Sequence, residues 1–140
     1  MADTVRTQIV HNGPKNFVLH LTSTSDGTGE NKVKKIDIAT INATSTMPPI
    51  DRLTLLKYTC STINMGVILW WEATTDIPML IFPSNYNTIV DLTTRGGIAN
   101  NAGVGRTGNV LLSTVGAEGT STTIATATYD LYLEFRKHYV

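Results

Sequence analysis

Apolar and polar residues alternate in short runs along this chain, which is the pattern of half-buried β-strands. In the first run, Val5, Thr7 and Ile9 share one face of an extended segment. A second run, Asn16 to Ser23, follows an Asn-Gly-Pro break at residues 12–14. Because asparagine and glycine both tolerate positive φ, this break favours a tight turn. The two runs are therefore predicted to form a β-hairpin.

Similar runs recur to the end of the chain, separated by clusters of turn-forming residues. Residues 43–49 end in Met-Pro-Pro, which favours an extended crossing rather than a helix. In the last run, apolar positions from Tyr129 to Phe135 alternate with polar ones. We predict strands over Thr4 to His11, Asn16 to Ser23, Lys32 to Ile41, Arg52 to Ser61, Val67 to Glu72, Ile77 to Phe82, Thr88 to Thr93, Asn109 to Val115 and Thr123 to Val140.

Composition supports an all-β fold. Thr, Val and Ile supply 23, 10 and 12 of the 140 residues, whereas Glu supplies 4 and Lys 6. β-branched side chains fit a pleated surface, and the straight-chain residues that coat exposed helices are scarce. We therefore expect one all-β domain over residues 1–140, an antiparallel, jelly-roll-like β-sandwich of about eight or nine short strands.

One stretch, Arg95 to Gly108, holds five glycines and predicts a long loop too flexible for regular structure by itself. Within it, residues 103–108 match the GxGxxG pattern of dinucleotide sites. That chemistry requires a helix N-terminus after the glycines to hold the pyrophosphate. Here the glycines run into a predicted strand, so we expect a loop and no nucleotide cofactor.

Charge narrows the range of partners. Eleven basic and eleven acidic residues give a formal net charge of +0, which argues against a nucleic-acid partner. The charged fraction of 16% gives little repulsion between copies, which favours a homo-oligomer. The N-terminus shows no apolar secretory region, and the longest apolar run, Gly66 to Trp71, is far shorter than a membrane span. We therefore expect synthesis in a cytoplasm and no membrane partner.

Candidate catalytic and metal-binding residues are few. Cys60 is the only cysteine and lies in an alternating strand, where a small buried hydrophobe is expected. His11, His20 and His138 fall on separate strands without metal-ligand spacing. The acidic turn at residues 25–30 lacks the further carboxylates of a calcium loop. We predict a protein that is not an enzyme and that binds no metal and no cofactor.

Trp70 and Trp71 are adjacent, so in a strand their side chains must point to opposite faces. One can enter the core, and the other then serves as a sugar platform or as an interface anchor. Low charge, paired tryptophans and a long C-terminal strand imply more apolar surface than one small sandwich covers. We predict a homo-oligomer, with a trimer as the specific expectation, whose contacts lie near one tryptophan and the strand Tyr129 to Phe135.

Several blocks along the chain carry a resemblance to a known group of proteins. They are Met-Ala-Asp at the start, Asn12-Gly13-Pro14, the turn 25–30 with residues 33–37, the segment 71–76, and the loop 96–103 leading into Thr107-Gly108. In these blocks the chain resembles small virion-associated proteins of tailed bacteriophages and cyanophages. The resemblance implies a structural component of the particle. The small β-sandwich proteins of this group that decorate heads do so as oligomers, often trimers, and clamp neighbouring major capsid subunits. The resemblance implies the same for this chain.

The leading hypothesis is a capsid decoration, or cement, protein on the virion surface, made in the host cytoplasm, that binds and stabilises the major capsid protein lattice. A neck or tail structural protein and a carbohydrate-binding module on the virion surface are the alternatives. The N-terminal segment and the glycine-rich loop have the backbone freedom to fit a partner, and arginine is enriched in interfaces. We predict partner contacts at Val5, Arg6, Trp70, Trp71, Arg95 and Arg106.

Overall fold

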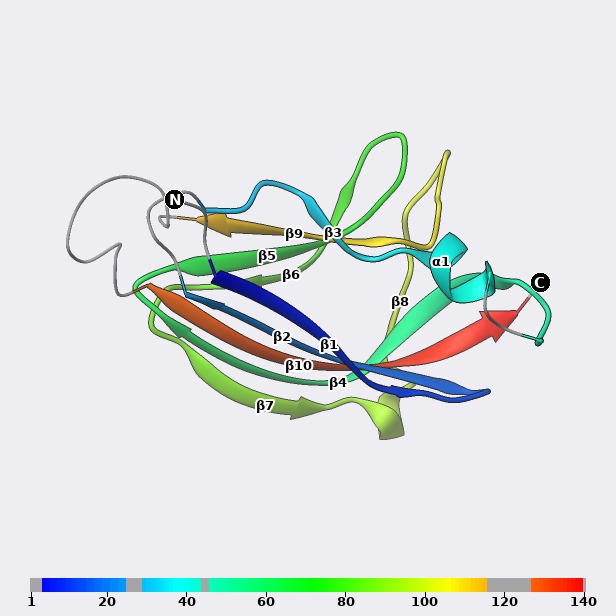
Figure 1. The fold of residues 1–140 in the computed structure, drawn as a ribbon, viewed down its shortest axis with the longest axis horizontal. Coiled ribbons are helices and arrows are strands. Elements are labelled where there is room, and N and C mark those ends of the chain that lie inside the picture. The colour runs from blue at the N-terminus through cyan, green and yellow to red at the C-terminus, as the bar shows by residue number, and fades with distance from the viewer. Residues whose placement is uncertain (1–3, 25–28, 44–45, 116–126, 140) are drawn as a thin grey trace.

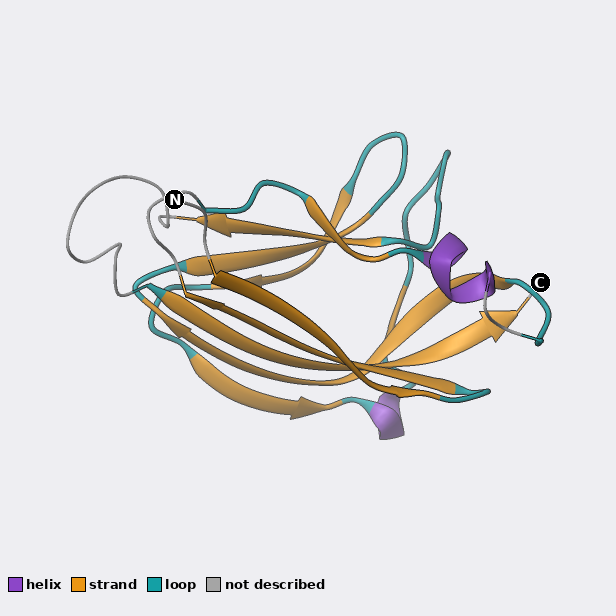
Figure 2. Ribbon diagram, in the orientation of Figure 1, coloured by secondary structure: helices purple, strands orange, loops and turns teal. Residues whose placement is uncertain are grey.

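A computed structural model describes residues 4–24, 29–43, 46–115 and 127–139. These residues form ten strands, one short α-helix and one 3-10 helix (Figure 2). The elements are β1 (Thr4–Asn12), β2 (Asn16–Thr24), β3 (Val33–Ile36), α1 (Ile38–Ala43), β4 (Ile50–Ile63), β5 (Gly66–Trp71), β6 (Ile77–Phe82), β7 (Asn87–Asp91), η1 (Thr93–Arg95), β8 (Ile98–Ala99), β9 (Val110–Val115) and β10 (Thr128–Tyr139).

The strands form two antiparallel sheets that face each other (Figure 1). The larger sheet has the order β1-β2-β10-β4-β7, with β8 paired to β4, and the smaller has the order β3-β9-β5-β6. If β1 and β8 are set aside, eight strands remain. Numbered along the chain, they give the orders 1-8-3-6 and 2-7-4-5, which is the arrangement of a jelly roll. The predicted jelly-roll-like sandwich is confirmed.

The hydrophobic core fills the space between the two sheets, because every second residue of each central strand points inward. On β10, Tyr129, Leu131, Leu133 and Phe135 are all buried. From the opposite sheet Trp71 meets the Phe135 ring edge-on, with centroids 6.4 Å apart. The long last strand thus lies in the centre of the larger sheet, between β2 and β4.

The N-terminal hairpin forms as predicted. In the turn, the Gly13 backbone N–H donates to the Asn16 carbonyl at 3.0 Å, and β1 and β2 pair antiparallel on either side of it. Val5, Thr7 and Ile9 lie opposite Ser23, Leu21 and Leu19, which are buried. Because directly opposed residues share a face, the predicted apolar side of β1 is its inward side.

The strand predicted over Lys32 to Ile41 is wrong in its second half, where α1 begins at Ile38. Asp37 caps this helix, since its carboxylate accepts the backbone N–H of Ala39 at 3.1 Å. The first helical N–H, of Ile38, donates to the Asn109 side chain at 2.8 Å. The helix buries Ile38 and Ile41, three positions apart on one face. Part of the predicted turn at 25–30, and the first residues of the strand predicted over Thr123 to Val140, lie outside the described residues.

A buried ion pair joins Glu30, which precedes β3, to Lys35 on β3. Lys35 Nζ lies 2.5 Å from Glu30 Oε2, and the two side chains are only 3% and 6% exposed. The Tyr129 hydroxyl donates to the other carboxylate oxygen of Glu30 at 2.6 Å. The Glu30 backbone also exchanges hydrogen bonds with Thr114 on β9. These contacts join the segment before β3 to both sheets.

Candidate interaction surface

The residues predicted to contact a partner lie on separate elements and do not form one patch. Val5 and Arg6 are exposed on β1, and Arg95 is exposed at the end of η1. Residues 2 and 3 of the N-terminal segment are outside the described residues. Trp71 is fully buried, so of the two tryptophans only Trp70 remains available to a partner. The sequence predicted the opposed directions but could not show which ring points inward.

Trp70 lies on the outer face of the smaller sheet and is partly buried. The Lys32 ammonium sits 4.5 Å from the centre of its ring, and Lys32 also pairs with Asp76 at 3.1 Å. The indole N–H donates to the Ser113 hydroxyl at 3.2 Å. A cation of the same chain therefore covers part of the ring, which leaves less flat aromatic surface for a sugar than the sequence suggested.

Two loops rise side by side above the smaller sheet (Figures 1 and 2). We call residues 72–76 and 100–108 together the loop projection. The Thr74 backbone N–H donates to the Val104 carbonyl at 3.1 Å, and the Thr107 N–H donates to the Glu72 carbonyl at 3.2 Å. The Glu72 carboxylate accepts hydrogen bonds from the Thr107 hydroxyl and the Asn109 amide, both at 2.7 Å. These bonds join the two loops into one unit.

Two glycines of the predicted flexible loop allow close packing against neighbouring segments. Gly105 has a φ of +79°, and a Cβ there would lie 2.9 Å from the Thr74 backbone nitrogen. Gly97 also has positive φ, and a Cβ there would overlap the Leu55 carbonyl oxygen. In addition, β8 pairs with residues 54–55 of β4 inside this stretch. The predicted long loop is confirmed over residues 100–108, which contain no helix or strand, whereas Ile98–Ala99 form β8. At Gly97 and Gly105 the missing side chain lets the backbone approach its neighbours.

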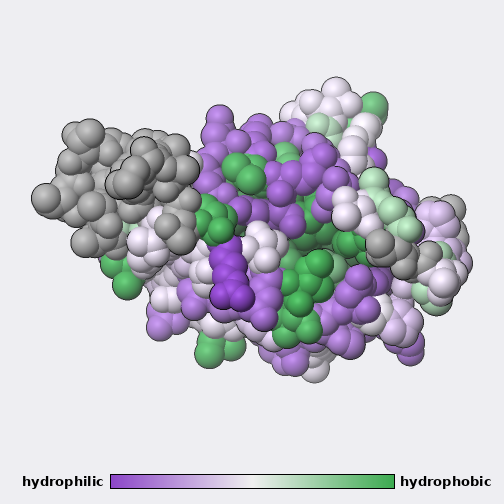
Figure 3. All heavy atoms as spheres, viewed as in Figure 1, coloured by the Kyte–Doolittle hydropathy of each residue, from purple (hydrophilic) through white to green (hydrophobic). Residues whose placement is uncertain are grey.

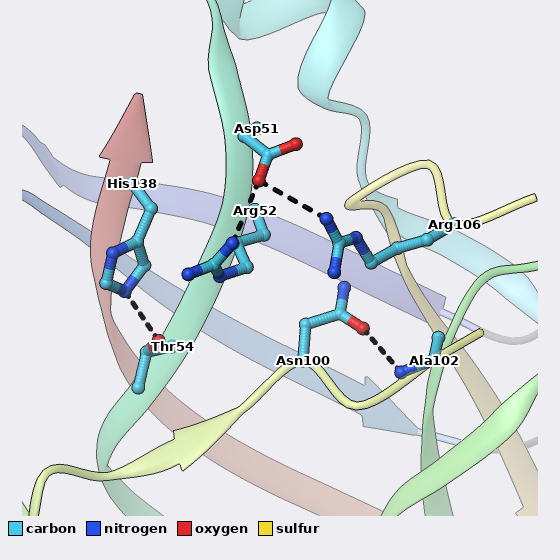
Figure 4. Close-up of polar contacts among 7 residues, drawn as sticks. All are labelled: Asp51, Arg52, Thr54, Asn100, Ala102, Arg106 and His138. Atoms are coloured by element: carbon cyan, nitrogen blue, oxygen red, sulfur yellow. Dashed lines mark hydrogen bonds and ion pairs between the residues drawn. The ribbon is translucent and has the colours of Figure 1, made fainter. Parts of the chain in front are cut away.

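Arg106 lies at the base of the loop projection, beside the start of β4 (Figure 4). Its guanidinium is 3.3 Å from Asp51 Oδ2, and the same oxygen accepts a hydrogen bond from Arg52 at 3.0 Å. Figure 4 shows both arginines turned toward this one carboxylate. The predicted contact residue is therefore held in place by an ion pair with a residue 55 positions away in the chain.

Two further polar groups lie in the same region (Figure 4). Asn100 is buried, and its side-chain oxygen accepts the Ala102 N–H at 3.0 Å, which shapes the entry to the loop. His138 Nε2 lies 2.7 Å from the Thr54 hydroxyl. Burial, followed by the nearby positive charge of Arg52, lowers the pKa of His138. His138 therefore contributes a hydrogen bond to Thr54 on β4.

The tip of the loop projection presents an apolar side chain. Val104 is 87% exposed although its backbone is hydrogen-bonded to the neighbouring loop. Beside it is a hollow of about 300 Å³, lined by Thr74, Thr75, Ile77, Gly103 and Val104. A protruding apolar residue on a braced support loses little conformational freedom when it docks. This arrangement can bind a complementary surface.

Side chains with reactive chemistry are not gathered at the projection. Burial raises the pKa of the Cys60 thiol to about 11, so it is a poor nucleophile at neutral pH. Within the described ranges, no three His, Cys, Asp or Glu side chains converge as metal ligands. The GxGxxG segment leads into β9, a strand rather than the helix of a nucleotide site. Nor does any helix in the part of the chain that the structure describes have the length and apolarity to cross a bilayer.

No family model, no curated protein and no solved structure matches this chain.

The residues of this surface were only partly predicted from the sequence. Arg106 was singled out, whereas Val104, Glu72 and Asp51 were not. The exposed valine among glycines was the available signal, since an apolar residue at a loop tip has no core to enter.

Proposed function

We propose that this protein is a structural component of a tailed-phage virion, a decoration protein that attaches to the major capsid protein lattice. The observation that carries the proposal is the loop projection, which presents Val104 on a braced support. The jelly-roll strand order supports it, because this architecture is common in viral capsid proteins and lectins. The resemblance of the sequence blocks to small virion proteins supports it as well.

Attachment would work through buried area rather than through a reaction. Val104 and the nearby Ile77 supply an apolar centre, and Arg106 supplies a charged rim. A specific interface buries about 1,600 Å² in total, so further surface must take part. Trp70 and Arg95 remain candidates for that surface, while Val5 and Arg6 lie on a different strand, β1.

The test is add-back of purified protein to particles that lack it, with occupancy measured by quantitative mass spectrometry. Copy numbers that follow the icosahedral lattice are expected, and Val104→Asp should lower occupancy at least tenfold. Ile89→Asp is the matched control, since Ile89 is 79% exposed on β7, away from the projection. Circular dichroism checks that both variants fold.

Three results would change the assignment. A few copies per particle would favour the neck or tail alternative over a decoration protein. Undiminished occupancy of Val104→Asp would move the contact away from the loop projection. Binding to a host glycan array that is lost in Trp70→Ala would favour the carbohydrate-binding alternative, despite the lysine over that ring.

A further inference from the structure

Within the described residues, five strands lie at edges of the two sheets, and four of them are poor templates for pairing. β8 has only two residues. β3 has only four residues and carries Lys34 and Lys35. β6 contains Pro78, which lacks a backbone donor, and β7 has five residues ending in Asp91. Short length, charge and proline are the usual protections of a sheet edge. β1 differs, because it has nine residues and its one formal charge is on Arg6.

The described residues leave the inward face of β1 partly exposed. Val5 and Ile9 are 38% and 57% exposed, although their neighbours on β2 are buried in the core. A hollow of about 170 Å³ separates the β1 face from Ile36 and the helix residue Ile41. Figure 3 shows apolar surface in this region, between β1 and α1. The strand thus offers both free backbone groups and apolar side chains along one edge.

The sequence of β1 suits antiparallel pairing with itself in the register centred on Thr7, where the two apolar residues Val5 and Ile9 meet. In the register centred on Thr7, Val5 of each copy lies opposite Ile9 of the other copy on the inward face. On the outward face, Arg6 of each copy lies opposite Gln8 of the other copy. Centred on Arg6 instead, the register would place two arginines directly opposite each other, which is destabilising. Any register centred between residues would bring inward residues opposite outward ones.

We propose that β1 pairs antiparallel with β1 of a second copy of this chain, centred on Thr7. The pairing joins two larger sheets into one across a two-fold axis. It covers residues 5–9, because the register of β1 against β2 shifts between Ile9 and His11. This inference does not depend on the proposed virion function. It is also distinct from the trimer expected from the sequence, and mass measurement separates the two.

The first test is the solution mass of the full chain by light scattering at micromolar concentration. A dimer is expected, and Ile9→Lys should raise the dimer dissociation constant at least tenfold. Ile89→Lys is the matched control, because it places the same charge on an exposed isoleucine of another edge strand, β7. A monomer, or a trimer that survives Ile9→Lys, would overturn the proposal.

The second test determines which residues of the two β1 strands lie opposite each other. It does not depend on whether the Ile9→Lys variant folds. At the two-fold centre, the Cα atoms of Thr7 and its copy would be about 4.5–5.5 Å apart, within disulfide range. Thr7→Cys should therefore form a covalent dimer under mild oxidation, seen on a non-reducing gel. Gln8→Cys should not, because that residue and its copy are offset along the strands. Cys60 is buried and does not compete. Equal cross-linking of both variants, or of neither, would refute this register.

Discussion

Replacing Lys35 by methionine would leave the Glu30 carboxylate buried without its cation. In the native protein the two charged atoms are 2.5 Å apart, and both side chains are almost completely shielded from water. The Tyr129 hydroxyl supplies one further hydrogen bond to the carboxylate. One neutral donor does not compensate for the loss of the ammonium group, because an unpaired charge in a low-dielectric interior is costly.

The expected loss is about 3–5 kcal/mol in the free energy of unfolding, the range for removing one partner of a buried pair. For a chain of this size, each kcal/mol lowers Tm by about 2–4 °C, so Lys35→Met should melt roughly 10 °C lower. Urea unfolding followed by tryptophan fluorescence measures the free energy, and calorimetry measures Tm. The change should appear as a lower midpoint with an unchanged slope.

The control is the double variant Glu30→Gln, Lys35→Met. It removes both charges, and the glutamine oxygen still accepts the Tyr129 hydroxyl. We expect it to recover more than half of the stability lost in the single variant, since a buried pair can often be replaced by neutral groups at little cost. A single variant that loses less than about 1 kcal/mol, or a double variant no more stable than the single one, would refute the reasoning.

Three further predictions concern packing and the thiol. Gly105→Ala should lower the free energy of unfolding by about 2–3 kcal/mol and loosen the loop projection, because the φ of Gly105 is positive and Thr74 lies close to it. Gly103 has open space around it, so Gly103→Ala should change the free energy of unfolding by less than about 0.5 kcal/mol. Trp71→Ala should cost about 3–5 kcal/mol and Trp70→Ala about 1 kcal/mol in urea unfolding, and similar losses would contradict the assignment of Trp71 to the core. Cys60, with its pKa raised to about 11, should resist iodoacetamide at pH 8 until the protein unfolds. Because the folded state keeps the thiol proton, stability should fall as the pH rises from about 9 toward 11, and a Cys60→Ala variant should lack that decline.

Features that depend on neighbouring residues could be predicted from the sequence alone. The alternation in β1, β2 and β10 predicted which residues share a face, because successive side chains of a strand point to opposite sides. The Asn-Gly pair predicted the first turn, and the abundance of β-branched residues predicted the all-β class. Each of these follows from local stereochemistry, which does not require knowledge of the rest of the chain.

Features that depend on contacts between residues far apart in sequence could be seen only in the folded structure. Trp71 rather than Trp70 is buried because that side of β5 faces the larger sheet. The helix at 38–43 replaces a strand in part because Asn109, 71 residues further on, accepts its first N–H. The glycine-rich loop is braced because Glu72 and Thr74 bind it from another loop. Local preference is weak at such positions, so long-range hydrogen bonds and burial select the conformation.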